Sequence, residues 1–323
     1  MAIIGVGGRT GTMFAFELRK HASVLGVGKE IEYIKKEKLF IKRKGSDPEL
    51  FEGEVITPLE FPSEVLPEII FLTTKNPVGP VVKNYYQKIK ESKMFPPTLI
   101  LSQNGVVAGE DAINVLKEVF GKNYKKIRVV RLNLFNPIDK REINNKTHIA
   151  YSLPIKLVFG KISGPGNLQD IALLFKKAGI VAKEFPSEKV KNMEFSKLFL
   201  NLIGMASATR GVSVNQGFGD SEIFREEIGV LKEYIKVVRA PGKSFVNFPH
   251  FPVKLFAFLF EIFPIEIFLP FRRFFAKLIS EGREGKPKDL GEIEYYNGAV
   301  VNLGKKIRIP TPVNEKVLKR VLK

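Results

Sequence analysis

The distribution of apolar residues predicts alternating strands and helices over roughly the first 150 residues. Short apolar runs of strand length are separated by segments with helical spacing, which is typical of a parallel sheet covered by helices. The predicted strands are residues 3–4, 22–27, 38–43, 54–57, 67–74, 97–101 and 127–133. The predicted helices between them are residues 13–20, 31–36, 78–90 and 110–120.

Beyond about Leu168 the pattern becomes mostly helical. Residues 168–178 form an amphipathic segment, and Ser187 is suited to cap a long helix that reaches about Ala208. Further helices are predicted at residues 221–238, 292–304 and 313–322.

The stretch of residues 253–275 is rich in phenylalanine, but charged residues and prolines interrupt it. It is too broken for a transmembrane helix, which needs about 20 predominantly apolar residues. We expect it to pack in the core or at a dimer interface, with contact to a membrane surface as the alternative.

A glycine-rich turn joins the first predicted strand to the first helix, between Ile4 and Met13. A dinucleotide pyrophosphate needs this order, because the backbone can approach the ligand and the first N–H groups of the helix point at the phosphates. Gly5 would form the turn and Gly7 the close approach, whereas Thr10 stands where a third glycine is usual and Gly11 follows it. The alternative is an ordinary glycine turn. The predicted cofactor contacts at this turn are Gly5, Gly7, Gly8, Arg9 and Thr10.

Two further polar residues follow predicted strands. Lys75 comes after residues 67–74, and Asn104 comes after residues 97–101. Because ligands of open parallel sheets bind beyond the carboxyl ends of the strands, we expect both residues near the glycine turn.

Composition narrows the class of protein. The chain has 323 residues, of which 44% are hydrophobic, so it is globular and long enough for two domains. It has no cysteine and three widely spaced histidines, which excludes disulfides and a cysteine nucleophile and argues against a metal cluster. The missing cysteines fit a reducing compartment, and no leader is expected before the first strand, so we expect a cytoplasmic protein.

The net charge of +18 favours anionic ligands. The basic residues are spread along the chain without a recognisable nucleic-acid module, so we expect no nucleic-acid partner and no membrane partner. The densest basic cluster lies between Lys35 and Lys44, close to where an adenosine 2′-phosphate would bind, although a solvated face explains most of it equally well.

Lys197 and Asn201 are four residues apart on the long predicted helix and therefore share a face. Apolar residues surround them, so Lys197 would be partly desolvated, which favours its neutral form and suits proton transfer. In the alternative, its stem packs on the core and its amine reaches water.

In combination, these segments resemble the ketopantoate reductase (2-dehydropantoate 2-reductase) family. The resemblance spans nearly the whole chain in the family's order. The matching segments are the glycine turn and residues 71–75, 101–106, 197–201, 292–298 and 310–314.

The resemblance implies an N-terminal Rossmann-type domain that binds NADP, residues 1–165, followed by an all-helical domain for substrate binding and dimerisation, residues 166–323. It implies NADPH-dependent reduction of a 2-keto acid, first of all 2-dehydropantoate to pantoate on the route to coenzyme A. Lys197 would be the general acid, and Glu292 would set its charge and position.

The resemblance also implies that Asn201 and Ser280 bind substrate, while Lys75 and Asn104 face the cofactor and the cleft. Met205 stands where the family commonly has a second substrate-binding asparagine. Two alternatives follow, a reductase of a different 2-keto acid and a non-catalytic NADP-binding protein.

The cofactor type depends on the residues after the second strand. Lys29 or Arg9 could hold a 2′-phosphate, which favours NADP, whereas Glu30 could hydrogen-bond the ribose of NAD.

Overall fold

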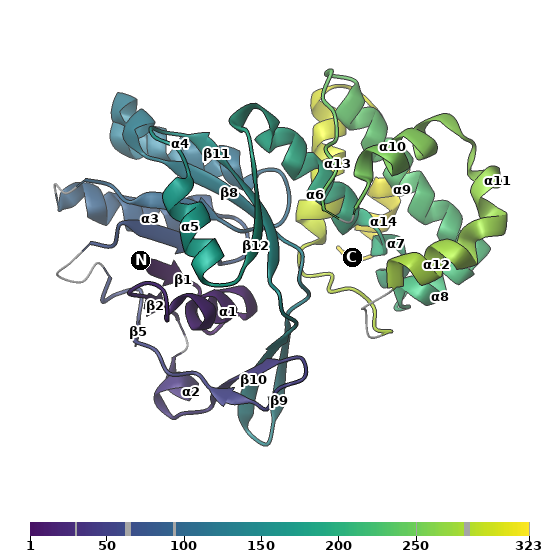
Figure 1. Cartoon of the computed structure of the whole chain (residues 1–323). Coiled ribbons are helices and arrows are strands. Elements are labelled where there is room, and N and C mark those ends of the chain that lie inside the picture. The colour runs from purple at the N-terminus through teal and green to yellow at the C-terminus, as the bar shows by residue number, and fades with distance from the viewer. Residues whose placement is uncertain (30, 62–65, 93–94, 250, 281–284, 323) are drawn as a thin grey trace. The chain divides into compact units, whose positions relative to one another are not determined.

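The computed structural model describes residues 1–29, 31–61, 66–92, 95–249, 251–280 and 285–322. The chain divides into two units (Figure 1). The first unit is Met1–Gln103 with Ala108–Val190, and the second unit is Asn104–Val107 with Lys191–Lys323. The boundary expected after residue 165 instead follows Val190, because the segment before it adds a strand to the sheet of the first unit.

A large sheet forms the centre of the first unit. Neighbouring strands run parallel except β8 and β11, which pair antiparallel. In the described residues the strand order is β12 (Val181–Phe185), β11 (Lys156–Ser163), β8 (Val129–Leu134), β7 (Thr98–Leu101), β6 (Ile69–Leu72), β1 (Ala2–Ile4), β2 (Leu25–Val27) and β5 (Val55–Ile56).

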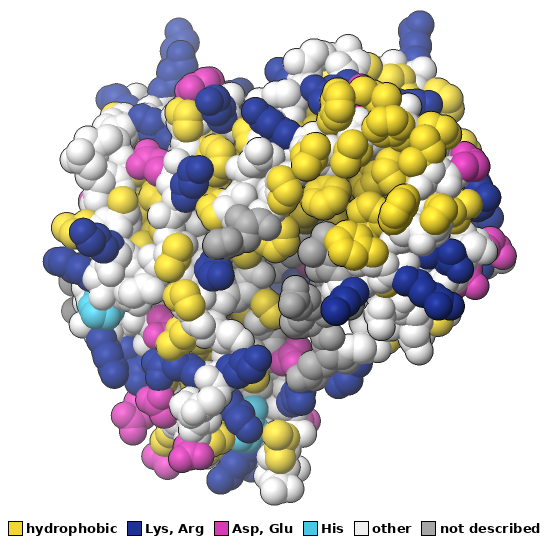
Figure 2. Space-filling view, turned by 45° about the vertical axis from the view of Figure 1, so that its right-hand side comes forward, with side chains coloured by type: hydrophobic (Ala, Val, Ile, Leu, Met, Phe, Trp, Pro, Cys, Tyr) yellow, Lys and Arg dark blue, Asp and Glu magenta, His cyan; other side chains and the backbone are white. Residues whose placement is uncertain are grey.

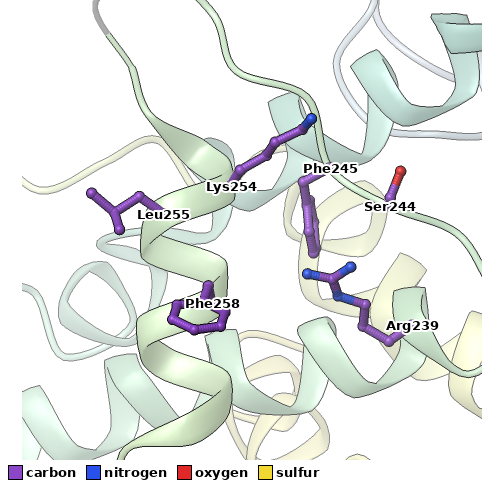
Figure 3. A pocket seen from close by; sticks show the side chains of 6 residues that line it. All are labelled: Arg239, Ser244, Phe245, Lys254, Leu255 and Phe258. Atoms are coloured by element: carbon purple, nitrogen blue, oxygen red, sulfur yellow. The ribbon is translucent and has the colours of Figure 1, made fainter.

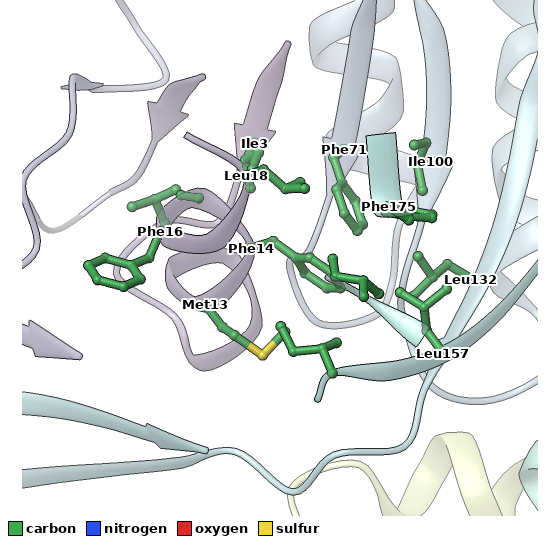
Figure 4. Close-up of a cluster of buried hydrophobic side chains, with 14 of the residues drawn as sticks. Ile3, Met13, Phe14, Phe16, Leu18, Phe71, Ile100, Leu132, Leu157 and Phe175 are labelled. Carbon is green, nitrogen blue, oxygen red and sulfur yellow. The ribbon is translucent and has the colours of Figure 1, made fainter. Parts of the chain in front are cut away.

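Helices cover both faces of this sheet, because the side chains of a strand alternate between its faces. On one face, Ile3 and Phe71 pack with Phe14 of α1 (Arg9–Leu18) and Phe175 of α5 (Gln169–Lys177) (Figure 4). On the other face, the neighbouring strand residues pack against α3 (Gly79–Glu91) and α4 (Ala108–Phe120), which is followed by a 3₁₀ turn, η1 (Gly121–Lys126).

A smaller sheet extends the first unit. Its strand order in the described residues is β4 (Glu49–Leu50), β3 (Leu39–Arg43), β10 (Lys146–Tyr151) and β9 (Asp139–Ile143), and a short helix, α2 (Glu32–Lys35), precedes β3. The apolar pattern did not predict β9 or β10. All residues of β9 are exposed, so no alternation of apolar and polar side chains marks the strand.

The second unit is helical, and α9 (Ser221–Arg239) lies at its centre. The predicted order of a parallel α/β unit followed by a helical unit is therefore confirmed. The other helices are α6 (Val190–Leu202), which begins one residue before the second unit, α7 (Met205–Ala208), α8 (Val214–Gly219), α10 (Val253–Ile262), α11 (Ile265–Phe268), η3 (Leu269–Phe271), α12 (Arg272–Ser280), α13 (Ile293–Lys306) and α14 (Pro312–Lys319).

The expectation of one long helix from Ser187 to Ala208 is wrong. Ser187 begins a separate 3₁₀ turn, η2 (Ser187–Lys189). The helix is also interrupted between α6 and α7, at Gly204, whose φ of +87° favours glycine. The carboxylate of Glu227 accepts hydrogen bonds from the backbone N–H groups of Gly204 (2.9 Å) and Ser207 (2.7 Å), which fixes this break. Burial raises the pKa of the Glu227 carboxyl group, although these hydrogen bonds act in the opposite direction.

The phenylalanine-rich stretch packs in the core on one side. Phe260 contacts Phe268 and Phe275, with ring centroids 5.1 and 6.3 Å apart, and Phe199 of α6 stacks on Phe260. The core expectation is therefore confirmed for this side, while the opposite side is exposed. No helix in the described part of the chain is long and apolar enough to cross a membrane.

Candidate functional site

The glycine turn of the first unit has the backbone conformation that a phosphate-binding turn needs. Gly5 and Gly7 have φ values of +105° and +95°, which favour glycine. A Cβ on Gly5 would lie 2.7 Å from Oγ1 of Thr73, so the turn packs closely on the end of β6. Gly8 then starts α1, and no side chain in the described residues caps this helix. The first N–H groups of a helix lack intrahelical partners, so this end of α1 suits an anion.

Gly11 provides the close packing usually given by the third glycine. A Cβ on Gly11 would lie 2.4 Å from the carbonyl oxygen of Gly5. A side chain at position 11 would therefore push the turn away from α1. Thr10 is half-buried. Gly28, after β2, is similarly tight, because its Cβ would lie 2.4 Å from the carbonyl oxygen of Val6.

Polar side chains join the carboxyl ends of β1, β6 and β7. Thr73 donates from Oγ1 to the carbonyl oxygen of Ile4 (2.6 Å), and Gln103 donates from Nε2 to the carbonyl oxygens of Leu72 (3.0 Å) and Thr74 (2.9 Å). Oγ1 of Thr74 and Oε1 of Gln103 are buried and have no hydrogen-bond partner among the described residues. Such atoms normally have a partner, so this edge is suited to a polar ligand. Together with the tight glycine turn, it fits a dinucleotide.

Two residues at this edge were missed by the sequence analysis. Lys140 of β9 donates from Nζ to the carbonyl oxygen of Gly7 (3.0 Å), which brings an ammonium group to the glycine turn. Arg131 of β8 is fully buried and donates to the carbonyl oxygens of Leu101 (3.0 Å) and Gln103. Both residues lie far along the chain from the turn, and their sequence neighbourhoods carry no recognisable motif.

The other predicted cofactor residues of the first unit lie on loops after strands. Arg9, Lys29 and Lys75 are all exposed. Lys75 precedes Asn76, whose peptide bond to Pro77 is cis. Glu30, the residue that would favour NAD, lies outside the described residues.

A hydrogen-bonded chain in the second unit joins three residues that the sequence analysis selected. Asn201 donates from Nδ2 to Oδ1 of Asn104 (3.3 Å), and Asn104 donates from Nδ2 to Oε2 of Glu292 (3.2 Å). The hydroxyl of Tyr296, one turn along α13, also donates to Oε2 of Glu292 (3.1 Å). Lys197 is half-buried on α6, one turn before Asn201. The structure thus places Asn104 beside the predicted substrate residue Asn201.

Two lysines hold the backbone around this chain of hydrogen bonds. Lys191 donates from Nζ to the carbonyl oxygen of Val106 (2.7 Å), which fixes the segment that carries Asn104. Lys288 donates from Nζ to the carbonyl oxygens of Asn201 (2.7 Å) and Ile203 (2.9 Å), at the end of α6. A cation at a helix C-terminus is favourable, because the last carbonyl groups lack intrahelical partners. Lys288 could not be found from the sequence, because this contact joins segments more than eighty residues apart.

The other two predicted residues of the second unit, Met205 and Ser280, are not part of this chain of hydrogen bonds as far as the structure describes them. Met205 is fully buried at the start of α7. Because Gly204 breaks the helix, Met205 does not continue the face shared by Lys197 and Asn201. Ser280 ends α12, and its side chain lies outside the described residues. The described part of the chain has no cluster of three or more histidine and acidic side chains that could hold a metal ion.

Comparison with known proteins identifies similar solved structures. No protein-family profile matches the chain, and no curated protein sequence matches it. A PanE/ApbA family ketopantoate reductase from Ralstonia eutropha JMP134 is 15% identical and has a TM-score of 0.72, with 100% of this chain and 97% of that chain covered. A 2-dehydropantoate 2-reductase from Methylococcus capsulatus is 18% identical and has a TM-score of 0.67, with 99% and 96% covered.

A D-mandelate dehydrogenase structure with NADH and anilino(oxo)acetate is also similar. It is 17% identical and has a TM-score of 0.70, with 99% of this chain and 97% of that chain covered. The likeness covers almost the full length of all three structures. This chain therefore has the fold that these ketopantoate reductase and D-mandelate dehydrogenase structures share.

Proposed function

We propose that the protein is a nicotinamide-dependent reductase of a 2-keto acid. The observation that carries this proposal is the hydrogen-bonded chain Asn201–Asn104–Glu292, with Lys197 one turn away on α6. It assembles a carboxylate, two amides and an ammonium group, which are the groups needed to bind a keto acid and to protonate its carbonyl oxygen. The shared fold and the glycine turn support it.

The first unit would hold the cofactor. The first turn of α1 and Lys140 would bind the pyrophosphate, with Gly5, Gly7 and Gly11 allowing its close approach. Lys75, Thr74 and Gln103 lie near the carboxyl end of the sheet, where such ligands bind. When bound, the reduced nicotinamide supplies a hydride to the carbonyl carbon.

The second unit would supply the proton. Negative charge develops on the carbonyl oxygen during reduction, and the Lys197 ammonium group would stabilise that charge and then donate its proton to the oxygen. Glu292 would hold Lys197 in its charged, correctly placed form, and Tyr296 would orient the Glu292 carboxylate through its 3.1 Å hydrogen bond. Asn201, and Asn104 beside it, would bind polar groups of the substrate.

We infer that 2-dehydropantoate is the substrate to test first, because two of the similar structures are ketopantoate reductases. The third similar structure, a D-mandelate dehydrogenase, favours a second candidate, an aromatic or branched 2-keto acid. The burial of Met205 is compatible with this second candidate. At position 205 the resemblance implies a substrate-binding asparagine, and here a core methionine stands in its place. Loss of NADPH absorbance on addition of each acid separates these candidates. Turnover of 2-dehydropantoate above all others is expected, and a strong preference for phenylglyoxylate would select the second candidate.

We further infer a preference for NADP over NAD. Lys29 follows β2 and Arg9 begins α1. Both side chains are exposed, and their charges suit a dianionic 2′-phosphate. The ratio of kcat/KM for NADPH and NADH measures this preference, and a ratio at or below unity would contradict it. A homodimer in the cytoplasm is the expected assembly and location, and light scattering of the purified protein checks the dimer.

Lys140→Ala is expected to weaken NADPH binding by about 10- to 100-fold, because a charge-assisted hydrogen bond contributes about 1.5–3 kcal/mol. Fluorescence titration with NADPH measures the change. Lys146→Ala is the matched control, since Lys146 is an exposed lysine of the same small sheet and its removal changes the net charge equally. Equal affinities for the two variants would mean that Lys140 does not contact the cofactor.

A further inference from the structure

One face of the second unit carries a concentrated apolar surface. Of the fifteen large hydrophobic side chains that are exposed in the described residues, eight lie between residues 251 and 274. We call this set the phenylalanine patch, and Figure 2 shows the apolar side chains gathered on this unit, with basic side chains around them. Its members are Phe251, Leu255, Phe258, Ile262, Phe263, Ile267, Phe271 and Phe274.

The patch follows from helical spacing. From Leu255 to Ile262 its members are spaced three and four residues apart, so they line one side of α10, while Ala257 and Phe260 are buried on the other side. The Phe271 and Phe274 pair, three residues apart, continues the surface along η3 and α12. The helix α10 is therefore apolar on two sides, and the core uses only one of them.

The patch is larger than a monomer normally exposes. Its five phenylalanines are between 38% and 64% exposed. They alone leave roughly 400–600 Å² of aromatic surface, and the leucine and two isoleucines add to it. The largest apolar patch on a typical monomer covers about 300–600 Å² in total and is often functional.

The charges around the patch favour an anionic partner. Its two acidic neighbours are both paired, Glu261 with Arg239 (3.5 Å) and Glu266 with Arg225 (2.6 Å). Lys254 and Arg273 are exposed between patch residues. The chain as a whole carries a net charge of +18.

A recess beside the patch combines apolar walls with positive charge. It has a volume of about 430 Å³ and is lined by Arg239, Ser244, Phe245 and Lys254, together with the patch residues Leu255 and Phe258. Figure 3 shows Lys254 extending toward Ser244 and Phe245, and the guanidinium group of Arg239 beside Phe245. The Lys254 ammonium group and the Ser244 hydroxyl, next to apolar walls, suit a phosphate group that continues into an acyl chain.

We propose that the phenylalanine patch binds the surface of a lipid bilayer that contains anionic lipids. The aromatic side chains enter the boundary between headgroups and acyl chains, and Lys254 and Arg273 contact lipid phosphates. The helices lie in the plane of the bilayer and do not cross it. This activity is independent of the proposed reductase function. It differs from the sequence-based expectation of no membrane partner and corresponds to the membrane-surface alternative given there for residues 253–275.

A second copy of the chain fits the patch less well. In a twofold dimer the same surface meets itself, so the excess of basic over acidic side chains around the patch would face the same excess on the other copy. An anionic bilayer supplies the opposite charge instead. A homodimer would accordingly use another face of the chain.

Co-sedimentation of the full chain with vesicles tests the proposal. We expect binding to vesicles of phosphatidylglycerol and phosphatidylcholine in equal amounts, much weaker binding to phosphatidylcholine alone, and weakening by added salt. The double variant Phe258→Ser/Phe274→Ser is expected to lose about 10- to 100-fold in vesicle affinity, because each phenylalanine contributes roughly tenfold or more to transfer out of water. Lys254→Glu/Arg273→Glu is expected to lose at least about tenfold for anionic vesicles.

The matched control is Leu59→Ser/Phe95→Ser, which removes two exposed apolar side chains of the first unit. Its vesicle binding should equal that of the unaltered chain, and circular dichroism verifies the fold of each variant. The proposal is overturned if the unaltered chain binds neither vesicle, or if Phe258→Ser/Phe274→Ser binds as well as the control. A dimer in solution that Phe258→Ser/Phe274→Ser converts to a monomer would also overturn it, by assigning the patch to a second copy.

Discussion

Lys197→Ala is expected to lower kcat by a factor of about 10²–10⁴, the usual contribution of a general acid, while the affinity for NADPH stays within about twofold. The reason is that Lys197 lies on α6 beside Asn201 in the second unit, whereas the glycine turn lies in the first unit. Steady-state kinetics with the keto acid and fluorescence titration with NADPH separate the two effects.

Two companion variants test whether Lys197 acts through proton donation. Lys236→Ala removes an exposed lysine of α9 and should leave kcat unchanged. Glu292→Gln should lower kcat, and the double variant Lys197→Ala/Glu292→Gln should lose less than the product of the two single losses, because the residues act as one unit. A folded Lys197→Ala protein with unimpaired kcat would support the alternative in which Lys197 is a structural lysine.

Gly11→Ala is expected to abolish most dinucleotide binding, with a loss of about 100-fold or more, since a displacement of about 1 Å in a site can have an effect of this size. The added Cβ would lie 2.4 Å from the carbonyl oxygen of Gly5 and 2.6 Å from Oγ1 of Thr73, so the turn must move. The free energy of unfolding should also fall by about 1–3 kcal/mol. NADPH titration and urea unfolding measure these changes.

Gly79→Ala provides the matched control. Gly79 also lies in the first turn of a helix, α3, but its Cβ would meet only Val115, at an ordinary distance of 3.5 Å. This variant should bind NADPH normally and gain up to about 1 kcal/mol, since alanine restricts the unfolded chain. If both variants bound NADPH equally well, the glycine turn would not be the cofactor site.

The sequence was informative where a segment is buried on both faces or follows a motif. Ile69–Leu72 and Thr98–Leu101 are almost wholly apolar, so their strands and the loops that follow could be predicted within a few residues. The candidate residues Asn201 and Glu292 of the second unit followed from the family resemblance. The structure joins both of them through hydrogen bonds to Asn104.

The missed features depend on contacts that local patterns do not encode. The exposed strand β9 has no apolar alternation, so neither the strand nor the approach of Lys140 to Gly7 could be predicted. Residues 166–180 look like the start of a helical domain, but β12 follows them and pairs with β11, which places them in the first unit. The helix break at Gly204 was missed because it depends on Glu227, a residue more than twenty positions away.

Transfer of deuterium tests the central claim most directly. The purified chain is mixed with 2-dehydropantoate and with NADPH that carries deuterium at its transferable position, and the organic acids are analysed by mass spectrometry. Our account predicts a 2-hydroxy acid that carries one deuterium at C2, formed in equal amount to the cofactor oxidised, and far less of it with Lys197→Ala. Tight binding of NADPH without consumption of 2-dehydropantoate or any other 2-keto acid would contradict the account and identify a non-catalytic dinucleotide-binding protein.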